Sequence, residues 1–187
     1  MIKDDGARKY ILERASEYGD AKLTCVLMKI FDMICDNQED DGCLSDSVAL
    51  LVVLRSLGYD VKLCYGLCTS PGGIDFYHAW LEMDGRVLDM AIYGNAHFSP
   101  FWLDDRSIGP YVFENYDDTR VKYYDRKFDE DWDQCMLYTV IRMRTLRAYI
   151  DNAPNNCMWN LIFELLGEAY SRSKRKELEK YFVGENF

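Results

Sequence analysis

Residues 42–58 read GCLSDSVALLVVLRSLG, and this stretch decides the expected fold. Its centre, Val48–Leu54, is apolar at every position, so a helix from about Cys43 to Leu57 would present apolar side chains in all directions. Other elements must then cover such a helix on every side. We therefore predict a buried central helix, with Asp40 or Asp41 as its N-cap and Gly58 as the left-handed residue at its end.

The sequence after this helix predicts a small antiparallel sheet. Runs of apolar and aromatic residues indicate strands at 61–67, 76–83 and 86–92. Asp84-Gly85, between the last two runs, is typical of a two-residue hairpin turn. Residues 93–130 show little periodicity and are predicted to be a loop-rich segment with short strands.

Both ends of the chain are predicted to be helical. Residues 7–36 carry apolar side chains at spacings of three and four and should form two helices that meet near Gly19-Asp20. Two further helices are expected at about 132–149 and 154–181, and Gly167 is a candidate break in the second. We expect a single α+β domain, divided into a helical N-terminal flank (1–40), a core (41–92), a loop-rich segment (93–130) and C-terminal helices (131–187).

Composition narrows the function classes. The net charge of −10 repels phosphate backbones, so nucleic acid is not an expected partner, and the basic run 172–176 is interpreted as a solvated helix face. The sequence shows neither a membrane-spanning apolar run nor the apolar core of a signal peptide at its start, so we expect a cytoplasmic protein without a membrane partner. Seven irregularly spaced cysteines indicate reduced thiols rather than a disulfide framework.

One of these cysteines is placed for nucleophilic chemistry. Cys43 opens the predicted central helix, where the first backbone N–H groups have no partner within the helix and carry partial positive charge. Such a position favours a thiolate, and the same N–H groups can stabilise an oxyanion. The alternative is that Cys43 is one more buried thiol.

A cysteine nucleophile needs a base, and the chain has only two histidines, His78 and His97. Pairing across the turn at 84–85 places Trp80 opposite Asp89. Because one face of a strand carries every second residue, His78, Trp80 and Asp89 then share a face, with Asp89 diagonal to His78. The carboxylate would orient the imidazole, although each residue can also be explained as part of a core or a strand end.

Two segments together resemble a known family. Residues 42–61, from Gly42-Cys43 to Val61, and residues 78–89, HAWLEMDGRVLD, look like the core of the transglutaminase-like superfamily. The resemblance is greatest to the bacterial branch that includes the lasso-peptide maturation proteases. It implies a papain-like fold, with a central helix on a small antiparallel sheet, and a Cys-His-Asp triad of Cys43, His78 and Asp89.

The resemblance also implies an activity. The expected function is that of a cysteine peptidase, amidase or acyltransferase that acts on a peptide or protein amide and needs no metal or organic cofactor. Papain-like enzymes often add a polar side chain before the cysteine as an oxyanion donor, which makes Gln38 and Asn37 candidates. Trp80 is expected to form a wall of the site, and His97 stays open as an alternative base.

The sequence leaves three other interpretations open. A zinc site would use Cys64 and Cys68, joined by Cys43 and His78, but the tight paired spacing of zinc ligands is missing. An arylamine-N-acetyltransferase-like enzyme would use the same triad in a longer chain. A non-catalytic peptide-binding protein would use the aromatic residues of the loop-rich segment, namely Phe98, Phe101, Trp102, Tyr111 and Phe113.

Overall fold

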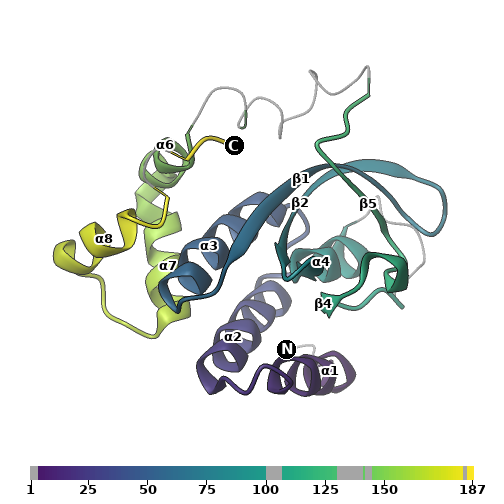
Figure 1. Ribbon diagram of the computed structural model, residues 1–187, viewed down its shortest axis with the longest axis horizontal. Coiled ribbons are helices and arrows are strands. Elements are labelled where there is room, and N and C mark those ends of the chain that lie inside the picture. The colour runs from purple at the N-terminus through teal and green to yellow at the C-terminus, as the bar shows by residue number, and fades with distance from the viewer. Residues whose placement is uncertain (1–3, 100–106, 130–140, 142–144, 183–184) are drawn as a thin grey trace.

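The computed structural model describes residues 4–99, 107–129, 141, 145–182 and 185–187. These residues form seven α-helices around a five-stranded antiparallel sheet of order β4-β3-β2-β1-β5 (Figure 1). The helices are α1 (Asp5–Ser16), α2 (Ala21–Asn37), α3 (Cys43–Ser56), α4 (Ala91–Phe98), α6 (Leu146–Asp151), α7 (Cys157–Leu166) and α8 (Arg172–Glu179). The strands are β1 (Val61–Thr69), β2 (Asp75–Met83), β3 (Arg86–Asp89), β4 (Tyr111–Glu114) and β5 (Lys122–Asp125).

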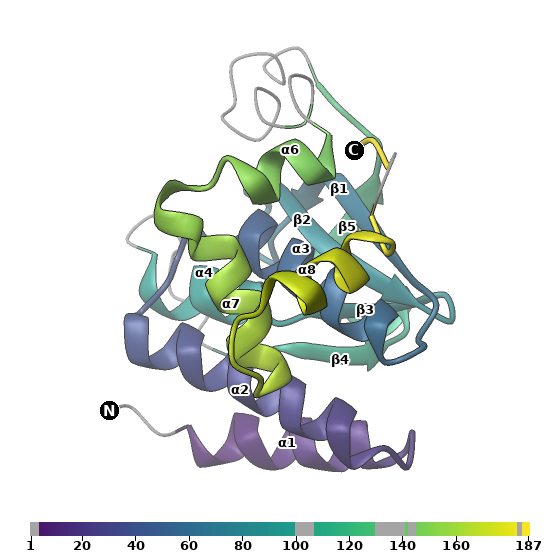
Figure 2. The same cartoon turned by 90° about the vertical axis from the view of Figure 1, so that its left-hand side faces the viewer.

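Helix α3 is the buried centre of the molecule, as predicted. Every side chain of Val48–Leu54 is at most 2% exposed. The helix packs against β1 and β2 on one side and against α7 on another, so that it lies between the sheet and the C-terminal helices (Figure 2). The apolar side chains on every face of α3 are therefore covered by neighbouring elements.

The ends of α3 confirm one prediction and correct another. Gly58 has a φ of 95° and takes the left-handed conformation expected after the helix. The N-cap is Gly42 and not Asp40 or Asp41, and no side chain caps the helix. The carbonyl of Gly42 accepts the first helical hydrogen bond, from the amide of Asp46, which leaves both aspartates too early in the chain to cap.

The β2–β3 hairpin has the predicted two-residue turn, since Met83 pairs with Arg86 and Leu81 with Leu88. The third strand is shorter than expected, because β3 ends at Asp89 and α4 begins at Ala91. The expected extension of this strand to residue 92 is wrong. A carboxylate oxygen of Asp89 accepts a hydrogen bond from the amide of Ile92, which helps to turn the chain into a helix.

The two flanks follow the prediction in outline. Helices α1 and α2 are separate, as expected from the break near residues 19–20. The segment 93–130 contains most of α4, the 3-10 turn η1 (Tyr116–Asp118) and the strands β4 and β5, which occupy the two edges of the sheet. Gly167, with a φ of 70°, ends α7 and confirms the predicted break.

The two helices predicted for the C-terminal part of the chain differ in outcome. The expected helix at 154–181 consists of η3 (Pro154–Asn156), α7 and α8. Most of the expected helix at 132–149 lies outside the described residues, as do Phe101, Trp102 and Cys135. Among the helices that the structure describes, none combines the length and the apolar character needed to cross a bilayer.

The sheet buries both of its faces. Alternate residues of β1 and β2, such as Leu63 and Leu81, belong to the main core around α3. The residues between them, including Trp80, belong to a second apolar cluster that α4 and the chain near β4 complete. The members of the second cluster are Cys64, Cys68, Trp80, Val87, Ile92, Ala96, Ile108, Tyr111 and Val121. His78 shares the strand face of Trp80 and therefore faces this side of the sheet.

Helix α4 approaches the loop before α3 very closely at Gly94. A β-carbon at this position would lie 2.1 Å from the carbonyl oxygen of Glu39. We predict that Gly94→Ala lowers the free energy of unfolding by about 1–3 kcal/mol, because backbone atoms have to move apart. Urea denaturation measures this change. Gly109→Ala is the control, since a β-carbon there meets nothing within 4 Å, and equal stability of the two variants would contradict the prediction.

Candidate active site

Cys43 is the first residue of α3 and is partly exposed. The N-terminal half of α3 is fixed to β2, because the hydroxyl of Ser47 donates a hydrogen bond of 3.1 Å to the carbonyl oxygen of Ala79. Ala79 is the neighbour of His78. This contact brings the beginning of the helix next to the histidine strand, so Cys43 combines a helix N-terminus with a nearby imidazole.

His78 and Asp89 form a buried pair. His78 Nε2 lies 2.8 Å from Asp89 Oδ2, and both side chains are fully shielded from solvent. Their contact follows from the hairpin register, which puts the two residues on the same face in neighbouring strands. The sequence-predicted residues Cys43, His78 and Asp89 therefore lie together in the structure.

The imidazole is held in an electrostatic field that favours its charged form. Burial by itself would lower the pKa of His78, but the charge and hydrogen bond of Asp89, followed by the interaction with Cys43, raise this pKa. Because Nε2 is occupied by Asp89, Nδ1 is the nitrogen left for the thiol. This Nδ1 is buried and has no well-formed hydrogen bond among the described residues.

Asp89 receives two further hydrogen bonds. The hydroxyl of Tyr123 donates to Oδ2 over 2.7 Å, and the amide of Ile92 donates to Oδ1 over 3.0 Å. Burial first, and then the charge of Asp89, raise the pKa of Tyr123, so its hydroxyl stays protonated and donating. Three donors from three elements thus fix one carboxylate.

Sequence reasoning missed Tyr123. It lies on β5, and it reaches the site because β5 pairs with β1 in a register that places Tyr123 opposite Cys68. These two strands are far apart in the sequence, and no local motif around residue 123 marks the pairing. Cys68 itself is buried close to Asp89 and Cys43, and burial followed by the charge of Asp89 raises its pKa well above the ordinary value.

Trp80 is connected to the candidate site through Tyr123. Its side chain is completely buried and its ring centre is 4.8 Å from that of Tyr123, which in turn contacts Asp89. The indole N–H donates to the hydroxyl of Tyr116 over 3.2 Å. The tryptophan therefore packs against Tyr123, the residue that donates to Asp89.

The two candidate oxyanion donors lie at the end of α2. Asn37 is its last residue and Gln38, with a φ of 52°, is its left-handed C-cap. Both residues are exposed. Asn37 also lines a pocket together with Ser45 and Asp46 of α3.

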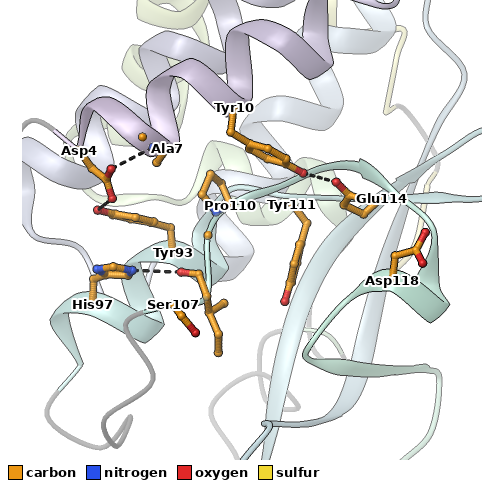
Figure 3. A pocket seen from close by; sticks show the side chains of 13 residues that line it. Asp4, Ala7, Tyr10, Tyr93, His97, Ser107, Pro110, Tyr111, Glu114 and Asp118 are labelled. Carbon is orange, nitrogen blue, oxygen red and sulfur yellow. Dashed lines mark hydrogen bonds between the residues drawn. The ribbon is translucent and has the colours of Figure 1, made fainter.

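His97, the other histidine, belongs to a different pocket (Figure 3). Its ring stacks on Tyr93 with 4.0 Å between the ring centres, and its Nε2 lies 3.0 Å from the carbonyl oxygen of Ile108. Tyr93 in turn donates to Asp4 at the beginning of α1. The volume of this pocket is about 420 Å³. His78, and not His97, is therefore the histidine that pairs with Asp89.

The thiols considered for a zinc site are deeply buried. Burial, followed by nearby carboxylates, raises the pKa of Cys64 to about 12. Within the described part of the chain, no group of three or more His, Cys, Asp and Glu side chains is arranged to hold a metal ion.

The raised pKa of His78 predicts a pH-dependent stability. A group whose pKa is higher in the folded state stabilises the fold below its ordinary value of about 6.5, and this contribution is lost as the pH rises through the folded value. We expect Asp89→Asn to lower the free energy of unfolding by about 3–5 kcal/mol at pH 6, and by less at higher pH.

Urea denaturation between pH 6 and pH 10 measures the stability difference caused by Asp89→Asn. An NMR titration of the His78 ring should also give a midpoint above about 6.5 in the wild type and a lower one in the variant. Asp117→Asn, at an exposed position, is the isosteric control. A stability difference that does not change with pH would contradict the assignment.

Comparison with known proteins identifies a family for this chain. No curated protein and no solved structure matched the chain significantly. A family model matches residues 6–102, which is more than half of the 187 residues and includes Cys43, His78 and Asp89. The family is described as the transglutaminase-like superfamily, and the chain belongs to it.

Proposed function

We propose that this protein is a cysteine peptidase, or an amidase or acyltransferase of the same type, that acts on a peptide or protein amide. The observation that carries the proposal is the His78 imidazole, which lies between the Asp89 carboxylate and the Cys43 thiol at a helix N-terminus. Within the superfamily, we propose a relation to the bacterial branch that includes the lasso-peptide maturation proteases.

In the first half of the proposed reaction, the Cys43 thiolate attacks the carbonyl carbon of the amide and a sulfur–carbon bond forms. The carbonyl oxygen becomes an oxyanion, which the backbone N–H of Cys43 stabilises. Gln38 or Asn37 supplies a second donor in this proposal. The His78 imidazolium gives its proton to the nitrogen as the carbon–nitrogen bond breaks, which leaves a thioester and a free amine.

In the second half, neutral His78 takes a proton from the incoming nucleophile, which attacks the thioester carbon. The sulfur leaves as a thiolate and the imidazolium is restored. Water as the nucleophile gives hydrolysis, and an amine gives acyl transfer. The same triad serves both outcomes, and no metal or organic cofactor takes part in the proposed steps.

Asp89 and Tyr123 have supporting roles in this proposal. Asp89 keeps the His78 ring in place and stabilises its positive charge. When His78 is neutral, Asp89 would be a buried charge without a counter-ion, and such a charge depends on hydrogen-bond donors for its stability. The hydroxyl of Tyr123 and the amide of Ile92 supply these hydrogen bonds, which makes Tyr123 a positioning residue.

The setting of the activity is also a proposal. Six cysteines of the described residues are free, which suits a reducing compartment such as the cytoplasm. The net charge of −10 favours a peptide or protein partner over a nucleic acid.

Alkylation of the cysteines tests the triad. We expect a brief treatment with iodoacetamide at pH 6 to label Cys43 at least about tenfold faster than the other cysteines, because paired thiolates react and thiols do not. His78→Ala should remove this advantage, while His97→Ala should leave it intact. Peptide mass spectrometry measures the labelling. If Cys43 reacts no faster than the others, the proposed triad is wrong, and the alternative of a non-catalytic peptide-binding protein has to be tested by binding.

The pH profile of the same labelling tests Tyr123. In Tyr123→Phe, Asp89 loses one hydrogen-bond donor and stabilises the His78 imidazolium less well, so we expect the acid limb of the Cys43 labelling profile to move towards neutral pH. Labelling at pH 8 should change little. Tyr124→Phe is the matched control, because Tyr124 is exposed on the same strand. A uniform loss at every pH would indicate a structural role only.

A further inference from the structure

A second small pocket lies beside the start of α3. It has a volume of about 210 Å³ and is bounded by the end of α2, the following loop and the beginnings of α3 and α7. Its apolar walls include Met33, Met158 and Leu161, and its polar groups include Asn37, Glu39 and Asp46. This space corresponds to about seven water molecules, enough for one extended side chain.

Asp46 is the unusual residue in this pocket. Its side chain lines the pocket although the residue is only 3% exposed, and Oδ2 has no hydrogen-bond partner among the described residues. A buried carboxyl group without a partner is costly, and native structures seldom retain one without a reason. Oδ2 itself has almost no accessible surface, so a ligand in the pocket would meet the Asp46 side chain at its edge, and a hydrogen-bond donor there would give this carboxyl group the partner that it lacks.

Asp46 links the pocket to the candidate active site, although Cys43 itself does not line the pocket. Asp46 follows Cys43 by three residues, which is a rise of about 4.5 Å and slightly less than one helical turn. Burial first, followed by the charges of Glu39 and Asp89, raises the pKa of Asp46, whereas His78 lowers it. Asp46 is thus within electrostatic range of both members of the buried pair.

The charge around the pocket selects the kind of ligand. Asp36, Glu39, Asp40 and Asp41 precede Cys43, and no lysine or arginine occurs from Asp36 to Leu54. None of the side chains that line the pocket is a lysine or an arginine either. An anionic group would be repelled, and an apolar group would leave the carboxyl group of Asp46 unpaired.

We infer that this pocket is a subsite for a lysine or arginine side chain of the peptide substrate, next to the amide that Cys43 attacks. The inference rests on the proposed function. The methionine and leucine walls would contact the alkyl part of the side chain, while Asp46 and Glu39 would bind its cationic end. A basic residue close to the cleaved or transferred amide is the expected sequence preference.

A matched pair of alkylating probes tests the subsite. N-(5-aminopentyl)-2-chloroacetamide carries an ammonium group at the end of a flexible five-carbon tail, and N-hexyl-2-chloroacetamide replaces this group by a methyl group. With either probe, the Cys43 sulfur displaces chloride. We expect the cationic probe to label Cys43 at least about tenfold faster in the wild type. A ratio near one would overturn the inference.

Variants separate the pocket from the general charge of the protein. Asp46→Asn should bring the ratio of the two rates close to one, and Asp117→Asn, with the same charge change at an exposed site, should leave it unchanged. A ratio that survives Asp46→Asn would contradict the subsite. If a thermal melt shows that Asp46→Asn is unfolded, Glu39→Gln takes its place as the test. This variant removes the other carboxylate of the pocket and should lower the ratio of the two labelling rates.

Neutral iodoacetamide distinguishes this inference from the proposed function. If iodoacetamide labels Cys43 fast in a way that depends on His78, but the cationic probe has no advantage, the subsite is wrong and the proposed triad stands. If the cationic probe is preferred in a way that depends on Asp46, but iodoacetamide labels Cys43 slowly and independently of His78, the catalytic role is wrong. The pocket then stands as a binding site for basic side chains.

Discussion

The carboxylate of Asp89 is the group on which the arrangement of the site depends. It is buried, and it accepts hydrogen bonds from His78 of β2, Tyr123 of β5 and the amide of Ile92 at the start of α4. A buried carboxylate is stable only with such partners. The hairpin, the edge strand and the helix α4 are therefore positioned by one charge, and this charge also sets the state of the imidazole that contacts Cys43.

Much of this arrangement could be predicted from the sequence, because the relevant signals are local. An uninterrupted apolar run predicts a helix buried on all sides, and Cys43 stands at its beginning. The Asp84-Gly85 turn fixes the hairpin register, and the two-residue period of strands then puts His78 and Asp89 on one face. A register shifted by one residue would have pointed the histidine to the other face.

The remaining parts depend on contacts between distant segments. Tyr123 reaches Asp89 only because β5 pairs with β1, and no pattern in a single strand specifies its neighbour. The residues of α4 are buried on nearly every side, so their apolar run resembles a continued strand, and the cap from Asp89 that decides between the two is visible only in the structure. The unpaired state of Asp46 likewise follows from packing rather than from spacing.

The acidic surroundings of Cys43 impose a further constraint. A negative charge on its sulfur is favoured by the helix N-terminus and the His78 imidazolium, but opposed by nearby carboxylates. Burial raises the pKa of Asp46 and favours its neutral form, which reduces the repulsion between Asp46 and the sulfur of Cys43. A cationic side chain in the adjacent pocket would allow Asp46 to ionise without adding net negative charge near the sulfur. The same binding event would then recruit the substrate and preserve the charge balance that a thiolate–imidazolium pair requires.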